Sequence, residues 1–149
     1  SNPSLVGVPA TVRVNPGKTT ATFNVTHAPV ATDTNVTISA DLGTYTRTVA
    51  LLVQSPSVKS LALNPTTVVG GQTSQATVTL TAPAPAGGIL VNLSTSNTKA
   101  RCPSSVLVPG GATQATFTVD SVNVNSQAGS YVRATIGTVT RSALLTLTP

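Results

Sequence analysis

Apolar and small polar residues alternate along most of this chain. In QATVTLT, residues 75–81, the apolar side chains Ala76, Val78 and Leu80 occupy every second position, and a threonine follows each of them. Successive side chains of a β-strand point to opposite faces, so this period predicts strands with one buried face. The period and caps of a helix do not appear, and the predicted fold class is all-β. Similar runs, separated by Gly, Pro, Asn or Ser, are VKSLAL, ILVNLS, ATFTV, YVRATI and ALLTLT.

The spacing of these runs from residue 55 onward predicts a sandwich of two antiparallel sheets. About seven strands in roughly ninety residues is the density of such a sandwich. The many Val and Thr residues agree, because branched side chains fit a pleated sheet better than a helix. We expect strands A to G at residues 58–63 with a continuation at 68–69, then 76–81, 89–93, 101–108, 115–119, 131–136 and 140–147.

The chain repeats part of itself. ATFNV at residues 21–25 returns as ATFTV at residues 115–119, which places Phe23 and Phe117 94 positions apart (117 − 23 = 94). A fixed offset over a long stretch indicates copies of one structural unit. The same offset aligns Pro9 with Pro103, Val12 with Val106, Gly17 with Gly111, Gly43 with Gly137, and TYTRT with TVTRS.

Residues 8–54 therefore repeat residues 102–148, which hold strands D to G, whereas no part of the chain repeats residues 55–101. We predict two domains: residues 1–54 are the C-terminal half of a sandwich, and residues 55–149 are a complete one. The half lacks strands A and B of one sheet and strand C of the other, so its apolar faces are expected to lie partly bare. The opening SNPSL, without Met, favours a piece cut from a longer polypeptide.

Inward positions of strands E and G are the expected core in both copies. Large apolar side chains at every second position of these strands would fill the space between the sheets. The expected core residues are Phe23, Val25 and Leu51 in the first copy and Phe117, Val119 and Leu145 in the second.

Charge is scarce in this sequence. Charged residues make up 7% of the chain, against about 25% in a typical domain. The net charge of +5 reflects the lack of acids, since the eight Lys and Arg residues are scattered and the chain has only four Phe and Tyr rings. A nucleic-acid partner is therefore not expected. The sequence has no run of about 18 apolar residues, which is the length needed to span a membrane. Cys102 can form no internal disulfide, and its counterpart Val8 favours a buried structural thiol.

Side chains suited to catalysis or metal binding are also few. His27 is the only imidazole, and its counterpart is Ser121; a hydrolytic triad needs a base beside its nucleophile. Asp33 and Asp41 lie in the first copy and Asp120 in the second, whereas a calcium site needs several oxygens close together. We expect no enzyme activity, no catalytic residue, no metal site and no cofactor.

Two surface features remain. Asn24, Asn35 and Asn92 match the acceptor pattern for N-glycosylation, which also occurs by chance in strands rich in Thr. Arg47 and Arg141 occupy the same place in the two copies. The expected role of these arginines is a charge on a strand edge that discourages pairing between sheets of different molecules.

A set of motifs marks the complete copy: NPTTVVGG at residues 64–71, VP at 108–109 ahead of ATFTV, and TVTRSA at 138–143. Together they resemble the bacterial Ig-like repeats that occur in tandem in large secreted and cell-surface proteins. The resemblance covers essentially the whole chain. It implies an Ig-like β-sandwich, an extracellular or cell-surface location, and a structural role as spacer, stalk or adhesive fibre without enzyme activity. The implied partners are neighbouring repeats of the same polypeptide.

Two other functions compete with this one. Open strand edges in the first copy favour a subunit of a polymeric filament, in which identical copies complement one another's strands. The neighbours of Phe23 distinguish this case, since contacts from another chain would support it. A carbohydrate-binding adhesive module with a cell-surface or glycan target would need exposed rings on a concave surface, and Tyr45 and Tyr131 are its candidates.

Overall fold

The computed structural model describes residues 4–149, and it divides the chain into two compact units that join between Ser55 and Pro56. We call the part up to Ser55 the half unit and Pro56–Pro149 the whole unit. Residues 4–149 contain 13 strands and no helix. The all-β fold class predicted from the alternation is therefore confirmed.

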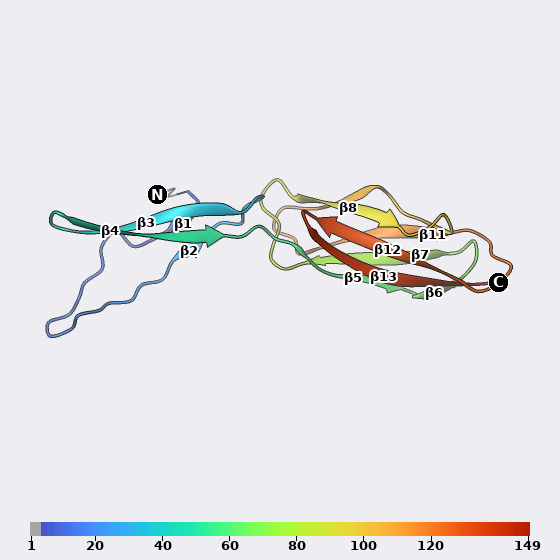
Figure 1. The fold of residues 1–149 in the computed structure, drawn as a ribbon, viewed down its shortest axis with the longest axis horizontal. Coiled ribbons are helices and arrows are strands. Elements are labelled where there is room, and N and C mark those ends of the chain that lie inside the picture. Colours follow the sequence, from blue (N-terminus) through green and yellow to red (C-terminus); the bar gives the residue numbers. More distant parts are fainter. Residues whose placement is uncertain (1–3) are drawn as a thin grey trace. The chain divides into compact units, whose positions relative to one another are not determined.

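The whole unit is a sandwich of two sheets (Figure 1). Its strands are β5 (Val58–Asn64), β6 (Thr67–Val69), β7 (Thr73–Leu80), β8 (Ile89–Thr95), β9 (Ala100–Arg101), β10 (Ser105–Val108), β11 (Gln114–Ser121), β12 (Ala128–Ile136) and β13 (Val139–Thr148). One sheet has the order β10-β8-β12-β13-β6 and the other has the order β5-β7-β11-β9. Expected strand A is thus divided between the sheets as β5 and β6, and expected strand D as β9 and β10.

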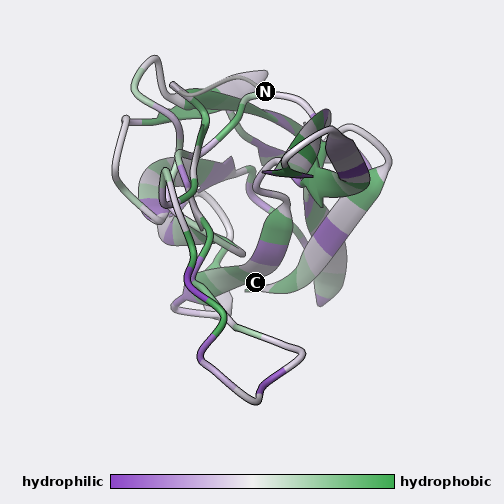
Figure 2. Cartoon of the chain, turned by 90° about the vertical axis from the view of Figure 1, so that its left-hand side faces the viewer, coloured by the Kyte–Doolittle hydropathy of each residue, from purple (hydrophilic) through white to green (hydrophobic). Residues whose placement is uncertain are grey.

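Alternation along each strand builds the core of the whole unit. Ala76, Val78 and Leu80 of β7 are no more than 2% exposed, while the residues between them face outward. Across the same sheet Phe117 of β11 pairs with Ala76, so a large ring lies beside a small side chain. Figure 2 shows hydrophobic and hydrophilic bands following one another along the ribbons. Burial contributes about 25 cal/mol for each Å² of apolar surface, so burying this face stabilises the sandwich.

The second and the last strands of the whole unit, β6 and β13, lie side by side and run the same way (Figure 1). β6 pairs with β13 in parallel, in the register Thr67 with Thr146, Val68 with Leu147 and Val69 with Thr148. Two further bonds extend this ladder: Gly70 N donates to Thr148 O at 2.8 Å, and Thr146 N donates to Thr66 O at 2.9 Å. The other ladders of the whole unit are antiparallel.

The half unit is built on one hairpin. Its strands are β1 (Val6–Gly7), β2 (Thr26–His27), β3 (Thr34–Leu42) and β4 (Tyr45–Val53). β3 and β4 pair along their whole length, from Thr34 opposite Val53 to Leu42 opposite Tyr45. Gly43 opens the two-residue turn with a φ of 58°, and its counterpart Gly137 has a φ of 55°. A positive φ at the first turn position alone is typical of a type II′ hairpin, where glycine is favoured.

The core of the half unit is small. It consists of Val6, Val30, Val36 and Val53, with Leu51 half-buried against them. All residues from Gly7 to Pro29 are exposed. In Figure 1 this segment leaves the β3–β4 hairpin as a long blue loop. Strand E was expected at ATFNV, but residues 21–25 are not in a strand, and β2 begins directly after them at Thr26.

Ser130 and Ser74 provide a matched test of the core of the whole unit. Both side chains are at most 1% exposed. The hydroxyl of Ser74 donates to Pro65 O at 2.6 Å, whereas Ser130 Oγ has no hydrogen-bond partner within residues 4–149. A buried polar group without a partner is destabilising.

We expect Ser130→Ala to raise the free energy of unfolding of the whole unit by about 1 kcal/mol, because it removes an unpaired buried hydroxyl. Ser74→Ala should lower that free energy by about 1 to 2 kcal/mol, because it removes a bond and leaves Pro65 O unpaired. Urea denaturation followed by circular dichroism measures both. Equal destabilisation by the two substitutions would contradict this assignment.

Candidate functional site

Four segments of the half unit have counterparts that pair with strands A to C of the whole unit. At the offset of 94, the edge of β11 that pairs with β7 corresponds to residues 20–26, and β10, which pairs with β8, corresponds to residues 11–14. The part of β12 that pairs with β8 corresponds to residues 38–41, and the part of β13 that pairs with β6 corresponds to residues 52–54. We call these four segments the open edges.

The ladders formed only among strands D to G are the same in both units. β1 pairs with β2 through Val6 opposite His27 and Gly7 opposite Thr26. At the same offset, β9 pairs with β11 through Ala100 opposite Ser121 and Arg101 opposite Asp120. The β3–β4 and β12–β13 ladders correspond in the same way, from Thr34 opposite Val53 and Ala128 opposite Leu147 onward. The half unit thus has the pairing pattern of the whole unit wherever both strands are present.

Apolar side chains on the open edges are exposed where their counterparts are buried. Phe23 is 44% exposed and Phe117 is 6% exposed; Val25 is 37% exposed and Val119 is fully buried. Phe23 and Val25 therefore differ from the expected core role, because the strands that cover Phe117 and Val119 have no counterpart in the half unit. Leu51 is half-buried, whereas its counterpart Leu145 is fully buried.

Val12 and Val14 follow the same pattern on residues 11–14. Val12 is 42% exposed and Val14 is 50% exposed, while Val108, the counterpart of Val14, is fully buried. Along the loop in Figure 2, hydrophobic bands alternate with polar ones as they do along a strand. Residues 11–14 and 20–25 therefore combine the sequence pattern of strands, exposed apolar side chains and backbone groups outside any ladder.

Asp33 fastens the end of the half unit through Ser55. Its Oδ1 atom accepts a bond from Ser55 N at 2.8 Å and a second from Ser55 Oγ at 3.0 Å. The backbone bond and, after it, the hydroxyl bond hold the pKa of the Asp33 carboxyl below its ordinary value. No local sequence pattern indicates this pair, because the two residues are 22 positions apart.

The other candidate side chains are dispersed. His27 is exposed on β2, with Nδ1 3.2 Å from Ala28 O. Asp41 is exposed and accepts a bond from the hydroxyl of Thr46, and Asp120 is exposed on β11. Within residues 4–149 no group of three or more His, Cys, Asp or Glu residues is placed to hold a metal ion. Cys102 is half-buried, and burial raises the pKa of its thiol.

The arginines at equivalent positions contact backbone carbonyls. Arg141 donates through Nε to Lys59 O and through a terminal nitrogen to Thr140 O, both at 3.1 Å. Arg47 donates to Thr46 O at 3.4 Å. Asn24, Asn35 and Asn92, the acceptor asparagines, are all exposed.

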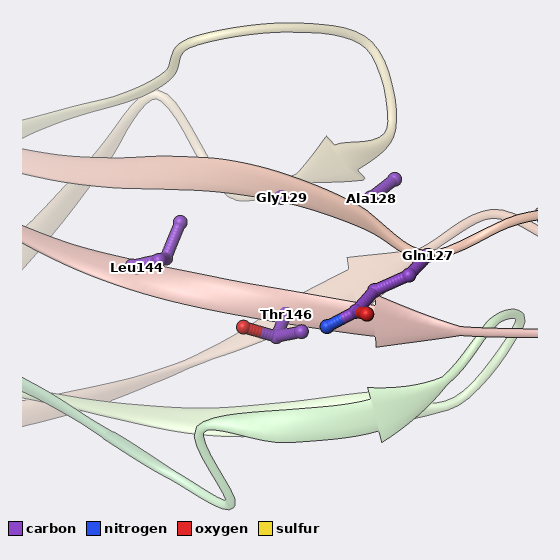
Figure 3. Close-up of a pocket in the computed structure, with 5 residues that line it drawn as sticks. All are labelled: Gln127, Ala128, Gly129, Leu144 and Thr146. Atoms are coloured by element: carbon purple, nitrogen blue, oxygen red, sulfur yellow. The ribbon is translucent and has the colours of Figure 1, made fainter.

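A shallow hollow of about 330 Å³ lies on the outer face of the β12–β13 pair (Figure 3). Gly129 stands opposite Thr146 in this ladder, and Tyr131 stands opposite Leu144. The absence of a side chain at Gly129 leaves the space between its neighbours open. A glycine inside a strand is the sequence signal that could have indicated it. The lining residues are Gln127, Ala128, Gly129, Leu144 and Thr146.

No protein-family model matches this sequence, and no curated protein matches it. The D00-D0 domain of Intimin matches in structure with a TM-score of 0.51 and 18% identity, over 91% of this chain and 77% of that one. The D0-D1 domain of Intimin has a TM-score of 0.48 and 18% identity, over 89% and 70%. Domains 4 and 5 of the S-layer protein SbsC have a TM-score of 0.45 and 20% identity, over 78% and 66%. The first of these matches shows the fold, which is the Ig-like β-sandwich.

A search for membrane-spanning helices, covering residues 4–149, found none of sufficient length and apolar character.

The pair of Asp33 and Ser55 predicts a pH dependence for the half unit. Folding lowers the pKa of the Asp33 carboxyl. The hydrogen bonds of this carboxylate therefore stabilise the half unit fully above the unfolded-state pKa of about 4, and this stabilisation is lost as the pH falls through the lower folded-state pKa. Hydrogen exchange at Ser55 N should therefore accelerate, relative to its intrinsic rate, at the acid end. Asp33→Asn should give faster exchange that no longer varies in this range, and Asp120→Asn serves as the control. A Ser55 amide that behaves alike in all three proteins would contradict the assignment.

Proposed function

We propose that this chain is a structural, load-bearing Ig-like segment of a bacterial cell-surface or secreted protein, where it acts as a spacer within a stalk or adhesive fibre. The Ig-like fold and the motifs at residues 64–71 and 138–143 support this function. Neighbouring Ig-like repeats of the same polypeptide are the proposed partners. The proposed mechanism is mechanical, and it involves no catalytic step and no cofactor.

The parallel ladder between β6 and β13 is the observation that carries this proposal. β6 lies near the start of the whole unit and β13 ends it, so a force applied at the two ends pulls these parallel strands in opposite directions. The backbone bonds lie across the direction of that force. All of them, including the bond from Gly70 N to Thr148 O at 2.8 Å, then bear load together. Shearing several bonds at once resists force better than opening them one by one.

Differences between the two copies also favour a structural role over a binding or catalytic site made of reactive side chains. The shared residues build strands, turns and core, as Gly43 and Gly137 or Phe23 and Phe117 illustrate. The residues that could perform chemistry are not shared. His27 corresponds to Ser121, Asp33 to Gln127, and Tyr131 to Thr37. Repetition has preserved the backbone arrangement and not a set of reactive groups.

Pulling the chain by its two ends tests the mechanical proposal. Val68→Pro in β6 removes a backbone donor from the parallel ladder, and we expect the force that unfolds the whole unit to fall sharply. Val106→Pro in β10 is the matched control, because β10 forms the opposite edge of the same sheet. Both substitutions should cost at least about 1 kcal/mol at equilibrium. Single-molecule force spectroscopy measures the unfolding force, and an equal drop in both variants would count against a load-bearing ladder.

Carbohydrate binding is a second candidate, favoured by the hollow on β12–β13. The hollow borders Leu144, whose cross-strand neighbour Tyr131 is 48% exposed. An exposed ring beside amide and hydroxyl groups from Gln127 and Thr146 could stack on a sugar and bond to its hydroxyls. Tyr45 is 73% exposed at the hairpin turn of the half unit and is not among the residues that line this hollow.

NMR titration with a panel of neutral oligosaccharides tests this second function. We expect the amide signals of Gly129 and Thr146 to shift at millimolar sugar. Tyr131→Ala should weaken the response about fivefold, because a lost stacking contact costs on the order of 1 kcal/mol. Tyr45→Ala is the control and should leave the response unchanged. Signals that stay in place with every sugar would exclude the hollow as a binding site.

A further inference from the structure

We propose that the open edges bind a further segment of the same kind as residues 56–94, whose strands take the places of strands A, B and C. The segment would supply strands A, B and C and would turn residues 1–54 into a second complete sandwich. This proposal concerns how the half unit is completed, and it holds or fails independently of the proposed mechanical function.

The register of the whole unit specifies each missing contact. A strand like β7 would pair with residues 20–26, as β7 pairs with β11 from Gln114 opposite Thr79 to Asp120 opposite Thr73. A strand like β8 would lie between residues 11–14 and residues 38–41, because β8 pairs with both β10 and β12. A strand like β6 would run parallel to residues 52–54. Three incoming strands therefore satisfy all four open edges.

Exposed apolar surface supplies the driving force for this binding. Phe23, Val25, Val12 and Val14 are between 37% and 50% exposed. The counterparts of Phe23, Val25 and Val14 are at most 6% exposed, because β7 and β8 complete the sandwich around them. Burying a large apolar side chain contributes about 1.5 to 3 kcal/mol. A strand whose inward residues resemble Val91 and Leu93 matches this surface.

A second copy of the chain is a poorer occupant. Its only segment with strands A to C belongs to its own whole unit, where Val58, Val78 and Val91 are fully buried. Transfer of that segment to another molecule would expose the core that it leaves. The half unit of a second copy contains only the equivalents of strands D to G. It therefore has no strand like β8, which pairs with a neighbour on each of its two edges.

The test is an extended chain in which residues 56–94 are placed directly ahead of Ser1 of the full 149-residue protein. We expect the amides of residues 11–14 and 20–26 to exchange at least about 100-fold more slowly than in the unextended chain, as amides inside a stable ladder do. Their protection should approach that of residues 105–108 and 114–120, which report on the folded whole unit in the same molecule. The extended chain should remain monomeric in analytical ultracentrifugation.

A matched pair of substitutions in the added segment tests the register. The added copy of Val91 faces the core in the proposed arrangement, since Val91 is fully buried, whereas Leu90 is 58% exposed. Val91→Asp in the added segment should abolish the protection of residues 20–26, and Leu90→Asp should preserve it. Lack of protection in the extended chain, while residues 114–120 keep theirs, would overturn the proposal. Protection of residues 20–26 that appears with dimers or polymers of the unextended chain would also overturn it and would assign the edges to a second copy.

Discussion

Strand β8 forms hydrogen-bonded ladders on both of its edges, with β10 on one side and β12 on the other. Backbone N–H and C=O groups need partners whenever they leave water, so a segment can be buried as a strand only where a neighbour supplies them. In the whole unit β8 provides those partners and also places Val91 in the core. The half unit has no equivalent of β8, and residues 11–14 lie exposed outside any strand although their apolar pattern matches β10.

Ladders and core depend on each other throughout this protein. Asp33 and Ser55, 22 positions apart, form their hydrogen bond because the pairing of β3 with β4 brings the ends of these strands together. Side chains contribute shape and burial, as with Phe117 beside Ala76, more than charge. A protein whose contacts are mostly backbone bonds and apolar packing is suited to bearing force and holding distance. This is the physical basis of the proposed spacer function, which does not depend on reactive side chains.

Much of the fold could be predicted because the relevant signals are local. The alternation in QATVTLT indicated β7 within a few residues of its true bounds, and the turn glycines indicated where hairpins close. The offset of 94 further predicted that the first copy would lack strands A to C. The unpaired hydroxyl of Ser130 could not be predicted. It depends on which atoms of distant strands come together, and a pattern along one strand contains no such information.

The sequence by itself determined the strand pattern, the class of fold and the repeated unit, because alternation, turn residues and an internal offset are properties of neighbouring positions. Only the tertiary structure decided which of two equal patterns became a buried strand. The apolar side chains of ATFTV are buried as part of β11 because β7 pairs along it, while ATFNV stays exposed up to β2 because no strand occupies the place of β7. Burial needs a partner for each backbone group as well as an apolar side chain, and that partner must come from elsewhere in the chain.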